Sequence, residues 1–172
     1  MKTFIYVLLL FLLSSSAIFA QNAVPKKVAV KSADVKTVER EKFDPMRSAA
    51  EDLKTAITQA TVEDKRIILD VGGEWCGWCR FMGNFFIKNA ALSKLRDDNF
   101  IWVKINFSDE NENKEFLSAY PTVKGYPHLF VLDKDGKLLH SQDTAALEGE
   151  TGYDLQKFTD FLTKWSPERK ND

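Results

Sequence analysis

Apolar positions along the chain alternate between the spacing of a helix and that of a strand. The first helical repeat consists of Ala49, Leu53, Ala56, Ile57 and Ala60. It predicts a helix that ends near Glu63, with Asp44 as its N-cap and Pro45 as its first residue. The next segment, Arg66–Val71, has an apolar centre and is followed by glycines, which predicts a buried strand.

The same alternation continues to the C-terminal region. A helix is expected from Gly77 to about Leu95, with Phe81, Phe85 and Phe86 on its inner side. The later expected elements are a strand at 100–107, a helix at 109–120 with Phe116 and Leu117 as apolar contacts, strands at 127–133 and 137–141, and a helix at 153–165 that buries Leu155, Phe158, Phe161 and Leu162. Asp135-Gly136 predicts a hairpin turn, because this pair tolerates a positive φ. The order of elements predicts an α/β fold with a central mixed β-sheet.

The first 20 residues have the pattern of an export signal. Lys2 is followed by an apolar run at 4–13 and then by small residues up to Ala20. The run is short for a membrane span, so we interpret residues 1–20 as a signal peptide cleaved after Ala20, with an uncleaved anchor as the alternative. Residues 21–43 are rich in Lys, Val, Ala and Glu, which predicts a linker or a loosely attached N-terminal arm. The folded domain is expected at residues 44–168.

The composition is typical of an ordinary globular domain. Hydrophobic residues make up 44% of the 172 residues, and 24 Lys and Arg nearly balance 25 Asp and Glu. The roughly 150 residues that follow the signal fit one domain. Since there is no basic excess, no nucleic-acid partner is expected.

The chain holds two cysteines, Cys76 and Cys79. Disulfides persist outside the cytoplasm, but a bridge across two residues closes too small a loop to restrain much of the unfolded chain. Zinc takes four ligands, and the sequence offers no second cysteine pair and only His128 and His140 as histidines. We therefore favour redox chemistry over a metal site or a purely structural disulfide, and no metal is expected.

The two cysteines occupy different positions relative to the expected helix. Cys76 lies at its start, where backbone N–H groups and the positive end of the helix dipole favour a thiolate. Cys79 lies one turn further on the same side, within disulfide reach. These positions suit an exposed nucleophile at Cys76 and a more buried resolving thiol at Cys79.

The surrounding segment resembles the active-site segment of thioredoxins. The match runs from Leu69 through Trp75 and Cys76-Gly77-Trp78-Cys79 to Arg80, and the segments 103–106, 123–127 and 135–136 match in the expected order. The similarity covers about residues 50–165 and is closest to exported thioredoxin-like proteins that are similar to the C-terminal domain of the periplasmic disulfide-interchange transporter. It implies the thioredoxin fold, with helices on both faces of the mixed sheet.

The resemblance also implies roles for residues outside the cysteine motif. Asp70 would be the buried carboxylate that exchanges protons with Cys79, and Lys104 would lie opposite and tune it. Their alternatives are an Asp in solvent at a strand end and an exposed strand Lys. Pro127, which follows Tyr126, would be a cis-proline that faces the cysteines and exposes the preceding backbone to a substrate strand. Its alternative is a trans proline at a strand start.

Two tryptophans flank the nucleophile. The expected substrate-binding surface consists of Trp75, Gly77, Trp78, Tyr126 and Pro127; packing beside the motif is the alternative for the tryptophans. Thioredoxins usually carry Pro at the position of Trp78, and isomerases and oxidases often carry His. Without a cation there, Cys76 should be a less extreme thiolate and the disulfide less oxidising, which favours a reductase. His128 is a candidate for restoring positive charge near the site, or else an ordinary strand histidine.

The sequence thus predicts a monomeric thioredoxin-fold protein, exported to a bacterial periplasm, that exchanges disulfides with protein substrates and needs no cofactor. Its electrons would pass to or from another dithiol protein, for which a membrane electron transporter is one candidate. An oxidase or isomerase is the alternative within the same chemistry. A binding or chaperone-like module with a non-catalytic cysteine pair is the alternative outside it.

Overall fold

The computed structural model describes residues 39–168, so the predicted signal peptide and most of the predicted 21–43 arm lie outside the described residues. The helices are α1 (Ala49–Glu63), α2 (Gly77–Lys88), α3 (Ala90–Asn99), α4 (Lys114–Leu117), η1 (Thr144–Leu147, a 3-10 turn) and α5 (Leu155–Lys164). The strands are β1 (Arg66–Gly72), β2 (Phe100–Asn106), β3 (His128–Leu132), β4 (Leu138–Asp143), β5 (Glu148–Gly149) and β6 (Gly152–Tyr153).

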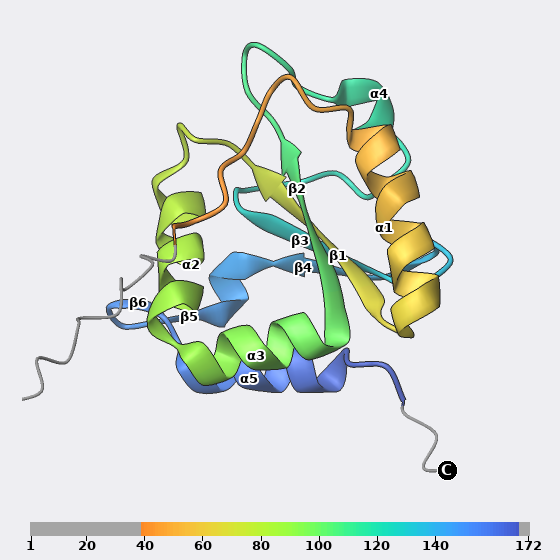
Figure 1. Ribbon diagram of the computed structural model, residues 1–172. Coiled ribbons are helices and arrows are strands. Elements are labelled where there is room, and N and C mark those ends of the chain that lie inside the picture. The colour runs from red at the N-terminus through yellow and green to blue at the C-terminus, as the bar shows by residue number, and fades with distance from the viewer. Residues whose placement is uncertain (1–38, 169–172) are drawn as a thin grey trace, which may run out of the picture. The chain divides into compact units, whose positions relative to one another are not determined.

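A four-stranded sheet in the order β2-β1-β3-β4 forms the centre of the domain (Figure 1). β1 pairs in parallel with β2 and antiparallel with β3, and β3 pairs antiparallel with β4. The parallel pair is joined through α2 and α3, as a parallel connection requires. The β3–β4 turn contains Gly136 at φ +87°, which confirms the turn expected from Asp135-Gly136. The sheet is therefore mixed, as predicted.

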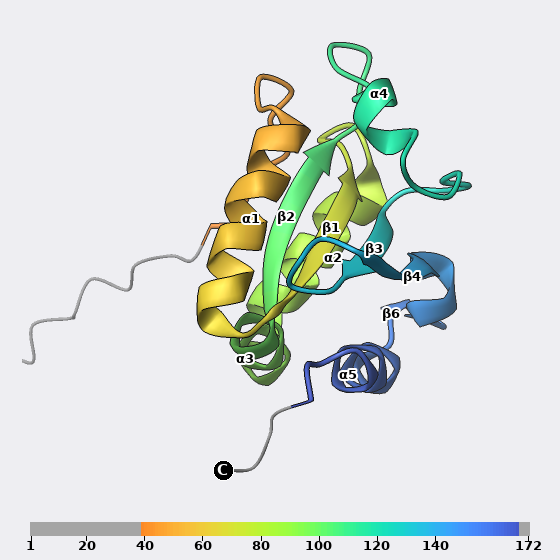
Figure 2. The ribbon, with the colours of Figure 1, turned by 90° about the vertical axis from the view of Figure 1, so that its right-hand side faces the viewer.

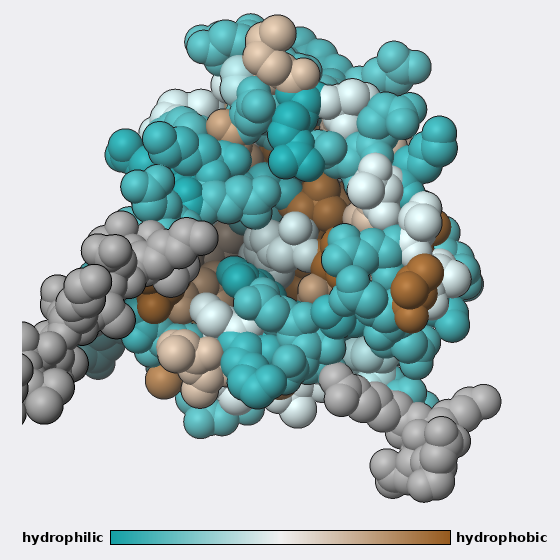
Figure 3. Space-filling view, viewed as in Figure 1, coloured by the Kyte–Doolittle hydropathy of each residue, from teal (hydrophilic) through white to brown (hydrophobic). Residues whose placement is uncertain are grey.

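Helices cover both faces of this sheet, as Figures 1 and 2 show from two directions. Successive side chains of a strand point to opposite faces, so Ile67 and Leu69 pack with α1 whereas Ile68 packs with α2, α3 and α5. Figure 3 shows mainly hydrophilic residues on the view of Figure 1, with hydrophobic residues near the centre and in smaller patches toward the edges. The expected α/β fold with helices on both faces is confirmed.

The first helix starts later than predicted. α1 begins at Ala49 and its N-cap is Ser48, whose hydroxyl accepts a hydrogen bond from the N–H of Glu51. The Asp44 side chain instead accepts from the N–H of Met46 at 2.8 Å. Asp44 therefore caps a turn, because a local side-chain bond competes with helix formation.

The long helix expected to end near Leu95 is wrong, since it is two helices that meet at Asn89. The Asn89 side chain donates to the carbonyl of Phe85 at 2.7 Å, and its φ and ψ of −119° and 80° are not helical. The amide thus satisfies a carbonyl that the chain leaves at the end of α2. α3 then continues to Asn99.

The helix expected at 109–120 shrinks to the single turn α4. Asn113 adopts a left-handed conformation (φ 46°), and its side chain donates to the carbonyl of Asn106 at 2.8 Å. Asn111 holds the neighbouring turn through a bond from its side chain to the carbonyl of Pro45 at 2.9 Å. These asparagine contacts replace helical backbone bonds.

Two side chains expected inside are on the surface. Phe81 is 42% exposed and Leu155 is 49% exposed, whereas Phe86 and Phe158 are buried. Phe81 lies against the rings of Trp78 and Tyr153 instead of the sheet. The helical period placed these residues near the edge of the apolar face, where small rotations of the helix decide burial.

Candidate redox site

Cys76 and Cys79 form a disulfide at the start of α2, with 2.11 Å between the sulfurs and 5.2 Å between the Cα atoms. Cys76 is the N-cap of α2, and its Sγ accepts a hydrogen bond from the N–H of Cys79 at 3.1 Å. An N-terminal donor and the helix dipole favour negative charge on this sulfur. The position of both cysteines relative to the helix is therefore as predicted.

The exposure of the nucleophile differs from expectation. In the disulfide, Cys76 is 4% exposed and Cys79 is 0% exposed. Phe43 is buried against both, and Tyr126 packs on the same cluster. Cys76 keeps the larger exposed fraction, so the predicted order of burial is correct, but an open position for Cys76 is wrong because aromatic rings surround it.

Two glycines before the motif permit its close packing. A Cβ on Gly72 would lie 2.5 Å from the Cys79 sulfur, and one on Gly73 would lie 2.5 Å from the indole nitrogen of Trp75. Real side-chain atoms do not approach so closely, so both positions need glycine. The pair Gly72-Gly73, between a buried strand and the cysteines, is the sequence signal for this close packing.

Asp70 and Lys104 form a buried ion pair beneath the disulfide. They are directly opposite in the β1–β2 register, and the Lys104 ammonium donates to Asp70 Oδ2 at 2.7 Å. The exposed fractions of their side chains are 1% for Asp70 and 7% for Lys104. The placements implied for both residues are confirmed, and their solvent-exposed alternatives are wrong.

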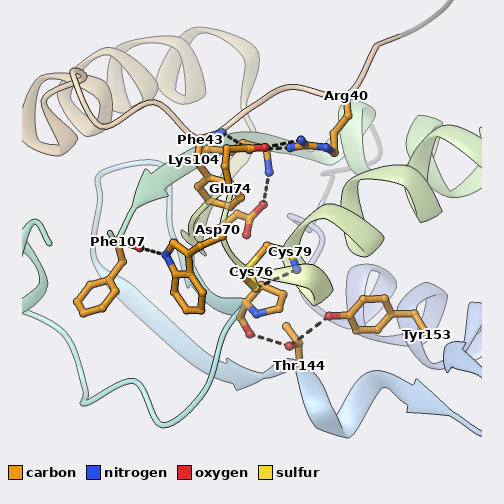
Figure 4. Close-up of a disulfide and its surroundings, with 12 residues drawn as sticks. Arg40, Phe43, Asp70, Glu74, Cys76, Cys79, Lys104, Phe107, Thr144 and Tyr153 are labelled. Atoms are coloured by element: carbon orange, nitrogen blue, oxygen red, sulfur yellow. Dashed lines mark hydrogen bonds and ion pairs between the residues drawn. A yellow bond between two sulfur atoms is a disulfide. The ribbon is translucent and has the colours of Figure 1, made fainter. Parts of the chain in front are cut away.

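The two oxygens of Asp70 have different surroundings. Oδ2 accepts from Lys104 and also from the indole N–H of Trp102 at 3.1 Å. Oδ1 is buried and has no hydrogen-bond partner among the described residues. Figure 4 shows the carboxyl group between the Lys104 ammonium and the disulfide. One oxygen is thus held in place by two donors, and the other has no partner among the described residues.

The segment before α1 reaches into the same site. Arg40 forms two hydrogen bonds to the carboxylate of Glu74, at 2.8 and 2.6 Å, and the N–H of Phe43 donates to Glu74 Oε1 at 2.8 Å. The bond from Arg40 lowers the pKa of Glu74 below its usual range. Sequence reasoning missed these residues, because a segment with no period carries no signal of a tertiary contact. The folded part therefore begins before the boundary expected at residue 44.

The peptide bond between Tyr126 and Pro127 is cis. The Pro127 carbonyl accepts a hydrogen bond from the Thr144 hydroxyl at 2.6 Å, and the Tyr153 hydroxyl lies 3.5 Å from the same Thr144 oxygen (Figure 4). Burial raises the pKa of the Tyr153 phenol, so it stays protonated. Thr144 and Tyr153 are further site neighbours that the sequence did not indicate.

The flanking tryptophans are the most exposed aromatic groups beside the disulfide, at 57% for Trp75 and 42% for Trp78. The indole N–H of Trp75 donates to the carbonyl of Phe107 at 2.6 Å, and its ring meets Tyr126 edge-on. Trp78 meets the ring of Tyr153 in the same way. Both tryptophans are therefore anchored at one edge and open to solvent at the other.

His128 does not supply a positive charge to this site. It pairs with Val71 in the β1–β3 register, so its side chain lies on the face opposite Asp70. Burial lowers the pKa of its imidazole, and Nε2 lies 2.8 Å from the Ser141 hydroxyl. The hypothesis that His128 tunes the cysteines is wrong, because alternation along the strand turns it away.

Among residues 39–168, no group of three or more His, Cys, Asp or Glu side chains is placed to bind a metal ion. Within the same range, none of the helices has the length and apolar character needed to cross a membrane.

Comparison with known proteins identifies the family. Residues 44–134 match the family described as thioredoxin-like, and this chain belongs to it. The chain is 26% identical over 104 residues to the thiol:disulfide interchange protein DsbD of Colwellia psychrerythraea, covering 59% of this chain and 17% of that protein. It is 29% identical over 83 residues to a protein disulfide-isomerase of Ricinus communis, covering 48% and 16%. It thus spans less than a fifth of these relatives.

Solved structures show the same architecture. A disulphide isomerase from Xylella fastidiosa is 27% identical, with a TM-score of 0.62 over 71% of this chain and 94% of that one. The C-terminal domain of DsbD from Neisseria meningitidis, in its oxidised form, is 20% identical, with a TM-score of 0.52 over 73% and 99%. The thioredoxin fold and the similarity to the C-terminal domain of DsbD, both expected from the sequence, are confirmed.

Proposed function

We propose that this protein is a thiol–disulfide oxidoreductase that reduces protein disulfides outside the cytoplasm. The observation that carries the proposal is the Asp70 carboxyl group, which is fully buried next to a disulfide at a helix N-terminus and keeps one oxygen without a partner among the described residues. A structural disulfide needs no such group, and burying it has a cost in stability. The thiol–disulfide chemistry of the named relatives supports the same interpretation.

The first step uses Cys76 in the reduced protein. Its thiolate, at the N-cap of α2, attacks one sulfur of a substrate disulfide. The substrate S–S bond breaks, one substrate thiolate leaves, and a mixed disulfide joins Cys76 to the substrate. The α2 N-terminus favours the attacking thiolate.

The second step uses Cys79 and Asp70. The Asp70 carboxylate accepts the Cys79 proton through Oδ1, and the Cys79 thiolate attacks the Cys76 sulfur. The mixed disulfide breaks, the second substrate thiolate leaves and takes a proton from solvent, and the Cys76–Cys79 disulfide forms. Two electrons have passed from the cysteine pair to the substrate. Lys104 holds the other Asp70 oxygen throughout.

The substrate is expected to bind over the flanking aromatic surface. Trp75 and Trp78 offer exposed apolar area on the two sides of the disulfide, and the backbone before the cis Pro127 is suited to pair with an extended substrate. Gly77 has open space around its Cα, so a substrate chain can approach there.

We further propose a bacterial periplasmic location and re-reduction by a dithiol partner, with a membrane electron transporter as the candidate. The signal-like residues 1–20 and the similarity to DsbD support this. The proposed acting form is a monomer without cofactor or metal.

The test is reduction of insulin disulfides by the full chain with a dithiol donor. We expect turnover in the unchanged protein and none in Cys76→Ser; activity that survives Cys76→Ser would refute the proposal. Cys79→Ala should trap substrates as mixed disulfides on Cys76, and a variant that captures nothing would refute protein substrates. A potential near that of strong oxidants would refute the reducing direction.

Disulfide isomerisation is a second candidate, favoured by the likeness to the Xylella fastidiosa protein. It predicts that the chain, once reduced, restores activity to a scrambled disulfide protein without net consumption of reductant. Cys79→Ala separates the two, because isomerisation needs only the attacking cysteine, whereas net reduction needs both.

A further inference from the structure

Phe43 is a buried aromatic residue in a segment that belongs to no helix or strand. Its side chain is 3% exposed and packs against Cys76 and Cys79. The Lys104 ammonium lies 4.1 Å from the centre of its ring. A Cβ built on Gly72 would be 3.2 Å from the ring tip and 2.5 Å from the Cys79 sulfur. One ring therefore touches both the disulfide and the cation that holds Asp70.

The same ring also separates this buried region from the surface. Phe43 lines a groove of about 570 Å³, together with Glu74, Trp75 and Phe107. Of the groups around the ring, Trp75 in the groove is 57% exposed, whereas Lys104 and Cys79 are buried. The same ring therefore borders both the groove and the cation of the ion pair.

A double anchor holds the ring in this position. Glu74, two residues before Cys76, accepts hydrogen bonds from the Phe43 N–H and from the Arg40 guanidinium. Arg40 is mostly buried, with 12% of its side chain exposed, because its chain lies against Gly83 of α2. A bidentate Arg–carboxylate pair fixes orientation as well as distance. The segment is thus tied to the loop that carries the cysteines.

We propose that Phe43 is a positioning residue of the redox centre, whose ring excludes water from Asp70, Lys104 and Cys79 while the Arg40–Glu74 pair holds it closed. An ion pair and a proton acceptor that are screened from water interact more strongly with their neighbours. Removal of the ring admits water to the buried pair, and it also removes a cation–π contact from Lys104. This inference rests on the proposed function.

The groups that face Asp70 come from several elements. Lys104 of β2 pairs with Asp70, and Arg40 and Tyr153 of β6 interact with it electrostatically. Glu74 interacts with Arg40 and Lys104, and the Cys79 side chain lies on the side of Asp70 away from Lys104 (Figure 4). Phe43→Ala changes none of them, so a changed pH dependence reports the access of water.

The experiment measures insulin reduction against pH in the full chain. For Phe43→Ala we expect the pH of half-maximal rate to fall by about one unit. Phe43→Leu, which keeps an apolar cover, should restore most of the original profile. Met46→Ala is the control, because Met46 lies in the same segment and is 89% exposed. In an Asp70→Asn background, Phe43→Ala should cause no further shift.

A Phe43→Ala protein that unfolds cooperatively and keeps the original pH profile would overturn the proposal. If that variant does not fold, Glu74→Gln takes its place: it removes the ion pair, keeps a carbonyl that can accept from Phe43, and should shift the profile in the same direction. A Glu74→Gln protein with an unchanged pH profile would then refute the proposal that the Phe43 ring excludes water.

The equilibrium of the cysteine pair with glutathione is measured in parallel, since it needs no protein substrate. We expect Phe43→Ala to change its constant by about three-fold or more. A changed equilibrium constant without insulin reduction would refute the proposed function and would still support the exclusion of water by Phe43. Insulin reduction with an unchanged equilibrium constant and an unchanged pH profile would support the proposed function and refute the role proposed for Phe43.

Discussion

The two faces of the β1–β2 pair bury side chains of different chemistry. Toward α1, β1 and β2 present only apolar side chains, among them Leu69 and Val103. Toward α2, the same strands bury the apolar Ile68 and also bury Asp70 and Lys104 below the disulfide. The α1 face shows that these two strands can be covered by a wholly apolar layer. The polar groups on the other face are therefore better explained by chemistry at the cysteines than by stability.

The largest effect on stability is expected on the apolar face. Leu69→Ala removes a fully buried side chain and should lower the free energy of unfolding by about 2–5 kcal/mol, because transfer and cavity terms add. The measurement is urea unfolding, with insulin reduction per folded molecule as the second readout. A redox activity that falls as steeply as the stability would show that the two faces are not independent.

The next effect separates what the Asp70–Lys104 ion pair contributes to stability from what it contributes to redox activity. Lys104→Met leaves the Asp70 carboxylate buried without its cation, and should cost about 3 kcal/mol in unfolding free energy. Combining it with Asp70→Leu should recover about 2 kcal/mol of that loss, since no buried charge remains. The double variant should still reduce insulin poorly. Full activity in it would show that the polar layer beneath the disulfide does not serve the redox chemistry.

A smaller, pH-dependent effect comes from His128, the buried histidine of the α1 face. Burial lowers its pKa from the ordinary 6.5, so the unfolded chain binds the proton more readily than the folded one. Stability is then complete above pH 6.5 and falls as the pH drops from 6.5 toward the folded pKa. Unfolding free energies at pH 7.5 and 5.5 should differ more for the unchanged protein than for His128→Gln. An equal difference between the two pH values in both proteins would show that His128 does not cause the pH dependence.

The smallest effect is expected at an exposed ion pair. Lys94 and Asp98 lie one turn apart on α3, 2.9 Å from each other, in the same kind of charge pairing as Asp70 and Lys104. Since both are exposed, Lys94→Ala should change the unfolding free energy by only about 0.3–0.5 kcal/mol. The measurement is the urea midpoint at low and high salt. A loss above about 1 kcal/mol would show that burial is not what distinguishes the two pairs.

Much of this protein follows from local sequence. The alternation of apolar residues determines the strands and the major helices, because burial of one face is a property of each segment. Cys76, Cys79 and Asp70 can be recognised since a strand end, two glycines and a helix start are consecutive in the chain. The opposition of Asp70 and Lys104 was implied by resemblance alone, and only the β1–β2 register places them 2.7 Å apart.

Other features depended on contacts between distant segments. The break at Asn89 and the short α4 follow from side chains that capture backbone groups in competition with helix formation. Phe43 and Arg40 belong to a stretch without periodicity, so only the folded chain reveals that they reach Glu74, which is distant in the sequence. His128 points away from the cysteines because its register partner on β1 is Val71, whose side chain lies on the face opposite Asp70. The sequence by itself determined the cysteine pair and the fold class, and tertiary structure decided what surrounds that pair, because burial and water access depend on the packing of separate segments.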